Sequence, residues 1–331
     1  MLTKEIVERC LDNVIVPAAA RSINDLNLVR DIEIVNEIIT IKLASTALNE
    51  GTREWLQEKI IEAVRNAEKD AKTTVEYIEA TPAELNEVGN VIAIMSGKGG
   101  VGKSLVAGLT AISLNRLGKS VGILDADITG PSIPKMFGIT GSPGGSESGI
   151  LPVSSKSGIE LMSINLLLPS EEEAVIWRGP LIGRAITQFW EEVLWGKLDY
   201  LVVDLPPGTA DAPLTVMQTL PVSGVIVVYT PQDLTAMIVK KAVRMAQQMD
   251  KPILGVVENM SYLYVEEIDK KIELFGKSQG DDMAKAANAP LLGQLPIDPN
   301  LAKLCDAGAI EGYDSEFIDN VGKVIIKATE K

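Results

Sequence analysis

With 331 residues, 46% of them hydrophobic, the chain is long enough for one large domain and one small domain. Its net charge of −14 argues against nucleic acid or an anionic membrane as a partner, and the absence of histidine excludes imidazole as a base or metal ligand. No apolar run is long enough to span a bilayer or to act as a signal peptide, so we expect a cytoplasmic protein.

The first ninety residues predict a small α+β domain with 17 acidic and 10 basic residues. In chain order, the elements that hydrophobic spacing predicts are a helix over residues 3–16, a hairpin over 29–43, a helix over 55–67 and a strand over 73–78. Pro17 should end the first helix, and Val35-Asn36-Glu37 should form the hairpin turn. We place this domain at residues 1–80 and a linker at residues 81–90.

Beyond residue 90, short apolar runs alternate with helical stretches. Runs this rich in β-branched residues are typical of a parallel sheet with helices on both faces. The predicted strands cover residues 91–95, 120–124, 161–164, 200–203, 224–229 and 253–257. We therefore predict an α/β domain over residues 91–331, with ligands gathered at the carboxyl ends of its strands. Glycine and serine dominate residues 141–149, which predicts a flexible surface loop.

A phosphate-binding P-loop follows the first of these strands. Residues 97–104 match Gly-x-x-x-x-Gly-Lys-Ser between a predicted strand and a predicted helix. The glycines let backbone N–H groups turn toward a phosphate, and the positive end of the helix strengthens the attraction. We expect ATP to bind here, with Lys103 on the β/γ-phosphates and the Ser104 hydroxyl on Mg²⁺. The expected binding residues are Gly97, Lys98, Gly99, Gly100, Val101, Gly102, Lys103 and Ser104.

Aspartates follow two other predicted strands and should lie at the same edge of the sheet. Asp204 ends an apolar run in the Walker B arrangement and should hold Mg²⁺ through water. Asp125 and Asp127 follow another strand, where they are candidates for a Mg²⁺ shell, for orienting the attacking water, or for helix capping alone. Residues 205–209 place two prolines before a glycine, which favours a switch loop.

Several stretches together resemble the Mrp/ApbC family of deviant-Walker P-loop ATPases, within the MinD/ParA superfamily. They are Lys98 inside the P-loop and residues 125–134, 174–180, 199–209 and 258–262. The similarity extends over roughly residues 90–310, and the N-terminal domain is similar, more weakly, to a small Fe–S assembly domain. The resemblance implies a homodimeric ATPase that delivers iron–sulfur clusters to apo-proteins, with an Fe–S scaffold or apo-protein clients as partners.

The resemblance also implies roles for single residues. Lys98 would reach across a dimer to the partner's phosphates, as an arginine finger does. Asp127 would position the lytic water, with Lys98 and Lys103 as the other catalytic groups. Asn259 and Pro296 would flank the adenine.

The sequence departs from this family at the cluster ligands. Val265 and Ile268 stand where cluster carriers usually have a Cys-x-x-Cys pair, and neither side chain can bind iron. The two cysteines, Cys10 and Cys305, lie far apart and favour buried, unpaired thiols. An Fe–S cluster is therefore possible by family, but its ligands are not found. The alternative hypothesis is a MinD/ParA-like, nucleotide-switched interaction or positioning protein.

Overall fold

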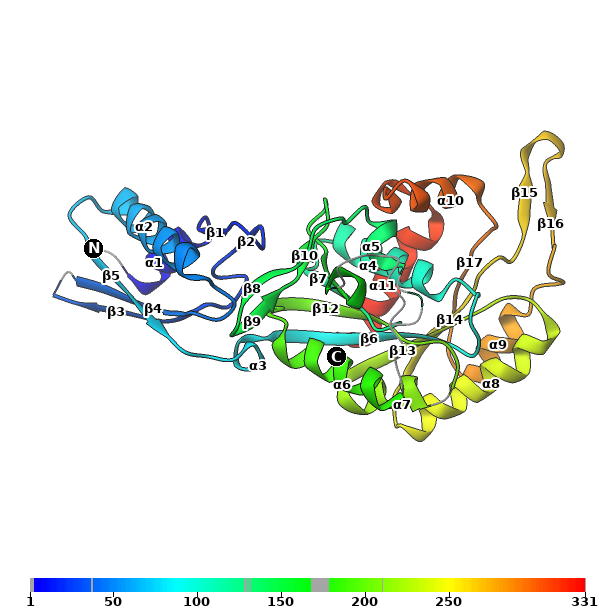
Figure 1. Cartoon of the computed structure of the whole chain (residues 1–331). Helices are drawn as coiled ribbons and strands as arrows, with labels where there is room; N and C mark the ends of the chain where they lie inside the picture. The colour runs from blue at the N-terminus through cyan, green and yellow to red at the C-terminus, as the bar shows by residue number, and fades with distance from the viewer. Residues whose placement is uncertain are drawn as a thin grey trace. The chain divides into compact units, whose positions relative to one another are not determined.

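The computed structural model describes residues 3–36, 38–127, 130, 132–167, 179–209 and 211–330. The chain divides into two compact units, each with its own core (Figure 1). The first contains Met1–Val88, Ser142–Ser154 and Gln188–Leu198. The second contains Gly89–Gly141, Ser155–Thr187 and Asp199–Lys331.

The N-terminal elements of the first unit follow the predicted order. They are α1 (Lys4–Leu11), β1 (Ile15–Val16), β2 (Arg21–Ser22), β3 (Val29–Val35), β4 (Ile38–Ala44), α2 (Glu50–Ala67), β5 (Lys72–Ile78) and α3 (Pro82–Leu85). The first helix ends at Leu11, so the prediction of a helix to residue 16 is wrong. The β-branched residues Ile15 and Val16 pair with β2 instead, and this strand pairing overrides the helical spacing.

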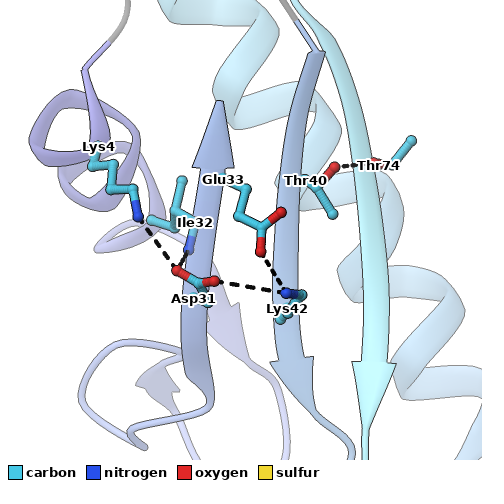
Figure 2. Close-up of polar contacts among 7 residues, drawn as sticks. All are labelled: Lys4, Asp31, Ile32, Glu33, Thr40, Lys42 and Thr74. Carbon is cyan, nitrogen blue, oxygen red and sulfur yellow. Dashed lines mark hydrogen bonds and ion pairs between the residues drawn. The ribbon is translucent and has the colours of Figure 1, made fainter. Parts of the chain in front are cut away.

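Strands β3, β4 and β5 form a three-stranded sheet (Figure 2). The predicted hairpin is confirmed, because β3 and β4 pair antiparallel and Asn36 takes a positive φ of 49° at the turn. Lys42 lies 2.6 Å from Glu33 and 3.7 Å from Asp31, and the Thr40 and Thr74 hydroxyls are 3.2 Å apart (Figure 2). These contacts are exposed, so each contributes little to stability.

The composition predicted a flexible loop over residues 141–149, and this prediction is wrong. β8 (Gly144–Ser146) pairs antiparallel with β9 (Gly149–Leu151) in a hairpin. Leu151 is buried in the same apolar core as the N-terminal helices, and this packing orders a segment whose glycines alone predict mobility.

An eight-stranded sheet dominates the rest of the chain. Its order is β10-β11-β7-β12-β6-β13-β14-β17, and the five pairings β11–β7, β7–β12, β6–β13, β13–β14 and β14–β17 are parallel. The strands are β6 (Glu87–Ser96), β7 (Val121–Asp125), β10 (Val153–Ser154), β11 (Glu160–Ser163), β12 (Lys197–Asp204), β13 (Val222–Tyr229), β14 (Ile253–Glu258) and β17 (Leu291–Gln294). The α/β fold class is confirmed, and each predicted strand is present.

Helices cover both faces of this sheet. α4 and α11 lie on one face and α7 and α8 on the other (Figure 1). The helices are α4 (Lys103–Arg116), α5 (Ile133–Met136), α6 (Gly179–Glu192), α7 (Asp211–Thr219), α8 (Asp233–Gln248), α9 (Gly280–Ala287), α10 (Pro299–Asp306) and α11 (Glu316–Thr329). A separate hairpin, β15 (Leu263–Val265) and β16 (Lys270–Ile272), stands away from the sheet (Figure 1).

Candidate nucleotide site

The P-loop connects the end of β6 to the start of α4. Gly100 and Gly102 have φ angles of 78° and 82°, in the left-handed region that glycine enters without strain. Gly102 is the N-cap of α4, so the unpaired N–H groups of the first helical turn lie next to the loop. This arrangement provides the donors and the positive helix end that a phosphate needs.

Lys103 is a buried cation between two aspartates. Its Nζ lies 2.5 Å from Oδ1 of Asp204 and 3.4 Å from Oδ2 of Asp127, and the residue is 5% exposed. Asp204 is the last residue of β12 and pairs in register with Asp125, the last residue of β7. The structure therefore brings together the lysine and the aspartates that the sequence had singled out.

The donor set at this edge fits Mg²⁺. Oδ2 of Asp204 is buried and has no hydrogen-bond partner within the described part of the chain. Ser104 occupies the second position of α4, next to Lys103. A carboxylate oxygen and a hydroxyl, completed by water and phosphate oxygens, form the hard-ligand shell that Mg²⁺ prefers.

Asp125 is a third carboxyl next to this cluster. It is fully buried, its Oδ1 accepts from the Asp127 N–H at 3.2 Å, and the Ser163 hydroxyl donates to its Oδ2 at 3.1 Å. Burial, together with the nearby charge of Asp204, raises the pKa of Asp125 to about 8. Burial also raises the pKa of Asp204, while Lys103 acts in the opposite direction. Lys103 and Asp204 form the close pair of this cluster, at 2.5 Å, and Asp125 lies in register beside Asp204 on the neighbouring strand.

The raised pKa of Asp125 predicts a pH dependence of stability. Between about pH 4 and pH 8, folded Asp125 keeps a proton that the unfolded chain has released, so raising the pH destabilises the fold. The contribution is at most about 1.4 kcal/mol per pH unit. When the pH is raised from 5 to 8, the unfolding free energy of Asp125→Asn should therefore fall less than that of the parent protein. Urea unfolding in the presence of a chelator measures both. Exposed Asp250→Asn is the control, and equal slopes for Asp125→Asn and the parent would contradict the assignment.

The predicted second switch lies beside the P-loop. Leu205 N–H donates to the Ile94 carbonyl at 3.1 Å, and Gly208 N–H donates to the Ser96 carbonyl at 3.0 Å. These bonds attach the segment after Asp204 to the strand that leads into the P-loop. From the other motifs, Ile128, Thr129, Pro131 and residues 174–178 lie outside the described residues.

Lys98 is partly exposed, and its ammonium is held by an amide of its own chain. Its Nζ donates to Oε1 of Gln232 at 2.6 Å. The Ser96 hydroxyl donates to the Lys98 carbonyl at 2.9 Å, which fixes the backbone at this point.

Asn259 braces the P-loop from the end of β14. It is 2% exposed, and its Nδ2 donates to the Val101 carbonyl at 2.9 Å. A Cβ atom at Gly102 would lie 2.1 Å from that Nδ2, so this contact also requires glycine at position 102. The sequence had placed Asn259 beside the adenine and gave no sign of this contact.

Glu258 is a buried carboxylate that the sequence reasoning missed. It accepts from the Ser261 hydroxyl at 2.6 Å, the Gln279 N–H at 2.8 Å and the Gln294 side chain at 3.2 Å. These bonds fix the turn that carries Asn259. The only indication of this role in the sequence is that a glutamate directly follows a predicted apolar strand.

The positions expected for cluster ligands are apolar in the structure as in the sequence. Val265 ends β15, and Ile268 is 61% exposed in the turn of the hairpin. Cys10 and Cys305 are free, partly buried thiols, and burial with the charge of Asp306 raises the pKa of Cys305. Across the described residues, no three cysteine or carboxylate side chains are grouped to hold a metal. None of the described helices is long and apolar enough to cross a membrane.

Comparison with known proteins decides the family. Residues 87–328 match the model of a ParA-type family described as the NUBPL iron-transfer P-loop NTPase. The chain belongs to this family. The resemblance to the Mrp/ApbC ATPases is thereby confirmed.

One relative matches nearly the whole chain, and others match about seven tenths of it. The chain is 37% identical to an iron–sulfur cluster carrier protein of Aquifex aeolicus, over 93% of each chain. It is 43% identical to one of Clostridium perfringens, over 72% of this chain and 87% of the relative. A solved nucleotide-binding protein from Archaeoglobus fulgidus, in complex with ADP, is 44% identical over 70% of this chain and 91% of that chain, with a TM-score of 0.63. The MinC:MinD complex of Aquifex aeolicus, at 19% identity and a TM-score of 0.51, shows the fold alone.

Proposed function

We propose that this protein is an ATP-binding, slowly hydrolysing, dimeric ATPase that acts in iron–sulfur cluster assembly or in cluster transfer to apo-proteins. The observation that carries the proposal is the buried Lys103, held between Asp204 and Asp127 at the start of α4. The ADP-bound relative and the relatives named iron–sulfur cluster carriers support the two halves of the proposal.

The residues of the site have different roles in phosphoryl transfer. The N–H groups of Gly97–Gly102 and the start of α4 bind the phosphates, and Lys103 exchanges its carboxylate partner for phosphate oxygens. Ser104 and Asp204 would hold Mg²⁺, which would neutralise negative charge on the phosphates. Asp127 orients the attacking water, and Lys98 of the second subunit stabilises the transition state.

Asp127→Ala should lose turnover while keeping nucleotide affinity within roughly tenfold of the parent protein, as expected for a group that acts in the transition state. Binding should survive because the P-loop N–H groups and Lys103, which contact the phosphates, are unchanged, and Lys103 loses only its longer contact, 3.4 Å to Asp127. Calorimetric ADP titration and steady-state phosphate release measure the two effects, with Asp127→Asn as the isosteric partner. Equal losses of binding and turnover would make Asp127 a structural or metal-shell residue.

The cluster is cargo in this proposal, and a partner that supplies the thiols would carry it. Val265 and Ile268 cannot bind iron, and Cys10 and Cys305 are free thiols that belong to no group of three or more cysteine or carboxylate side chains in the described chain. ATP-driven docking to a cluster-bearing scaffold or client is then the contribution of this chain.

Anaerobic reconstitution with iron and sulfide tests this division. The protein should stay colourless and still hydrolyse ATP, because two dispersed cysteines cannot form a four-thiolate site within one subunit. Visible absorption and iron content are the measurements. A dimer that holds about four irons, and loses them on Cys10→Ala or Cys305→Ala, would show that the chain carries the cluster itself.

The MinD/ParA-like positioning role is the weaker candidate. Eight relatives that are 36–43% identical are named iron–sulfur cluster carriers. The net charge of −14 also disfavours DNA or an anionic membrane as a surface for positioning. We place the protein in the cytoplasm as a homodimer, with no nucleic-acid or membrane partner.

A further inference from the structure

A cavity of about 580 Å³ lies between the β15–β16 hairpin and the loop after β17. Tyr262, Glu266 and Lys271 line it from the hairpin side, and Pro296 and Asp298 line it from the loop. The two walls are joined through the backbone, because Ile297 N–H donates to the Tyr262 carbonyl at 2.7 Å. The cavity is therefore built from both segments.

The cavity lies close to the P-loop, because a short, hydrogen-bonded stretch of backbone connects the two. Asn259 bonds the Val101 carbonyl at 2.9 Å, and Tyr262 follows it by three residues. Three residues span at most about 10 Å of chain. Ser261 N–H donates to the Leu295 carbonyl at 2.9 Å, which holds this short path against the loop. A ribose and its diphosphate can bridge such a separation.

The charges at the two ends have opposite sign. The P-loop end has Lys103 and the start of α4, which attract phosphate. The cavity end has the carboxylates of Glu266, Glu267 and Asp298 with one cation, Lys271. Carboxylates repel phosphate but accept hydrogen bonds from amino and hydroxyl groups, so this end suits the uncharged nucleoside part.

Lys271 is held at the cavity by an aromatic ring. Its Nζ lies 4.2 Å from the centre of the Tyr262 ring, within the range of a cation–π contact. Lys271 pairs with Tyr264 across the hairpin, and both residues line the cavity. Its neighbour Lys270 pairs with Val265, and strand alternation turns Lys270 to the opposite face.

We propose that the β15–β16 hairpin is part of the nucleotide site, with Lys271 and Tyr262 forming a wall against the base and ribose. The Lys271 ammonium donates to a base nitrogen or a ribose oxygen, and the carboxylates of Glu266 and Glu267 accept from the amino and hydroxyl groups. This inference rests on the proposed ATP binding and assigns to nucleotide recognition a hairpin that carries Val265 and Ile268 in place of cluster ligands.

The test compares two ligands and two variants by calorimetry on the full chain. ADP engages both ends of the site, whereas inorganic tripolyphosphate engages only the P-loop end. Lys271→Met should weaken ADP roughly three- to tenfold, the size of one hydrogen bond, and leave tripolyphosphate unchanged. Lys270→Met, with the same charge change on the other face, should bind both ligands as the parent does.

Each outcome has one meaning. Unchanged ADP affinity in Lys271→Met overturns the inference, and so does an equal loss for tripolyphosphate or an equal loss in Lys270→Met. Failure of the parent protein to bind ADP would overturn the proposed nucleotide site itself, and the parent titration shows this before any variant is measured. Exposed Lys271 can be replaced without disturbing the core, and Tyr262→Leu provides a second variant for the same wall.

Discussion

Replacing Lys103 by methionine should abolish ATP binding and also destabilise the folded protein. The first effect follows from the loss of the cation that faces the phosphates. The second follows because Asp204 is fully buried and Lys103 is its close counter-charge at 2.5 Å. Removing one partner of a buried ion pair costs about 3–5 kcal/mol. ATP titration and urea unfolding measure the two effects on the same protein.

The double variant Lys103→Met/Asp204→Asn separates these effects. It removes both buried charges, so most of the lost unfolding free energy should return, while ATP binding stays absent. Lys119→Met is the matched control, since its ion pair with Glu330 is at the surface and should contribute at most about 1 kcal/mol. ATP binding by the single variant, or a double variant no more stable than the single one, would contradict this account of the site.

The features that the sequence predicted correctly depend on local chemistry. The glycine spacing of the P-loop requires a left-handed backbone at Gly100 and Gly102, and both residues adopt it. The apolar runs that became β6, β12 and β13 are buried almost without interruption, which is the pattern of a covered parallel sheet. Because parallel strands end at one edge, the positions of Asp125 and Asp204 followed from the strands alone.

The features that the sequence did not predict depend on distant contacts. Asn259 bonds a carbonyl 158 positions earlier in the chain, and no periodicity reports such a pair. Glu258 is satisfied by the nearby Ser261 and by groups from two other segments, at Gln279 and Gln294, so its burial could not be expected of a glutamate. β17 is a four-residue strand between prolines, and it is a strand because β14 pairs with it.

Lys98→Ala should reduce ATP hydrolysis by on the order of 10³-fold or more, by analogy with arginine fingers. Within its own subunit the Lys98 ammonium is held by Gln232 at 2.6 Å, while Lys103 occupies the phosphate end. A partly exposed lysine bound to a neutral amide can leave that partner at small cost when a phosphate is offered. Phosphate release measured over a range of protein concentrations should show turnover rising with dimer formation in the parent and staying flat in Lys98→Ala.

Mixing two inactive variants decides whether Lys98 acts across the dimer. A Lys98→Ala subunit keeps Asp127 in its own site and lacks the lysine that it would offer to its partner, and an Asp127→Ala subunit has the reverse defect. If Lys98 acts in trans, the mixed dimer regains one complete site, so the mixture should recover up to roughly a quarter of parental activity for random pairing of equal amounts. If Lys98 acts within its own subunit, each site in the mixed dimer lacks one group and the mixture stays inactive. Lys98→Ala mixed with Lys98→Ala/Asp127→Ala is the control, because that partner has no lysine to donate and should restore nothing.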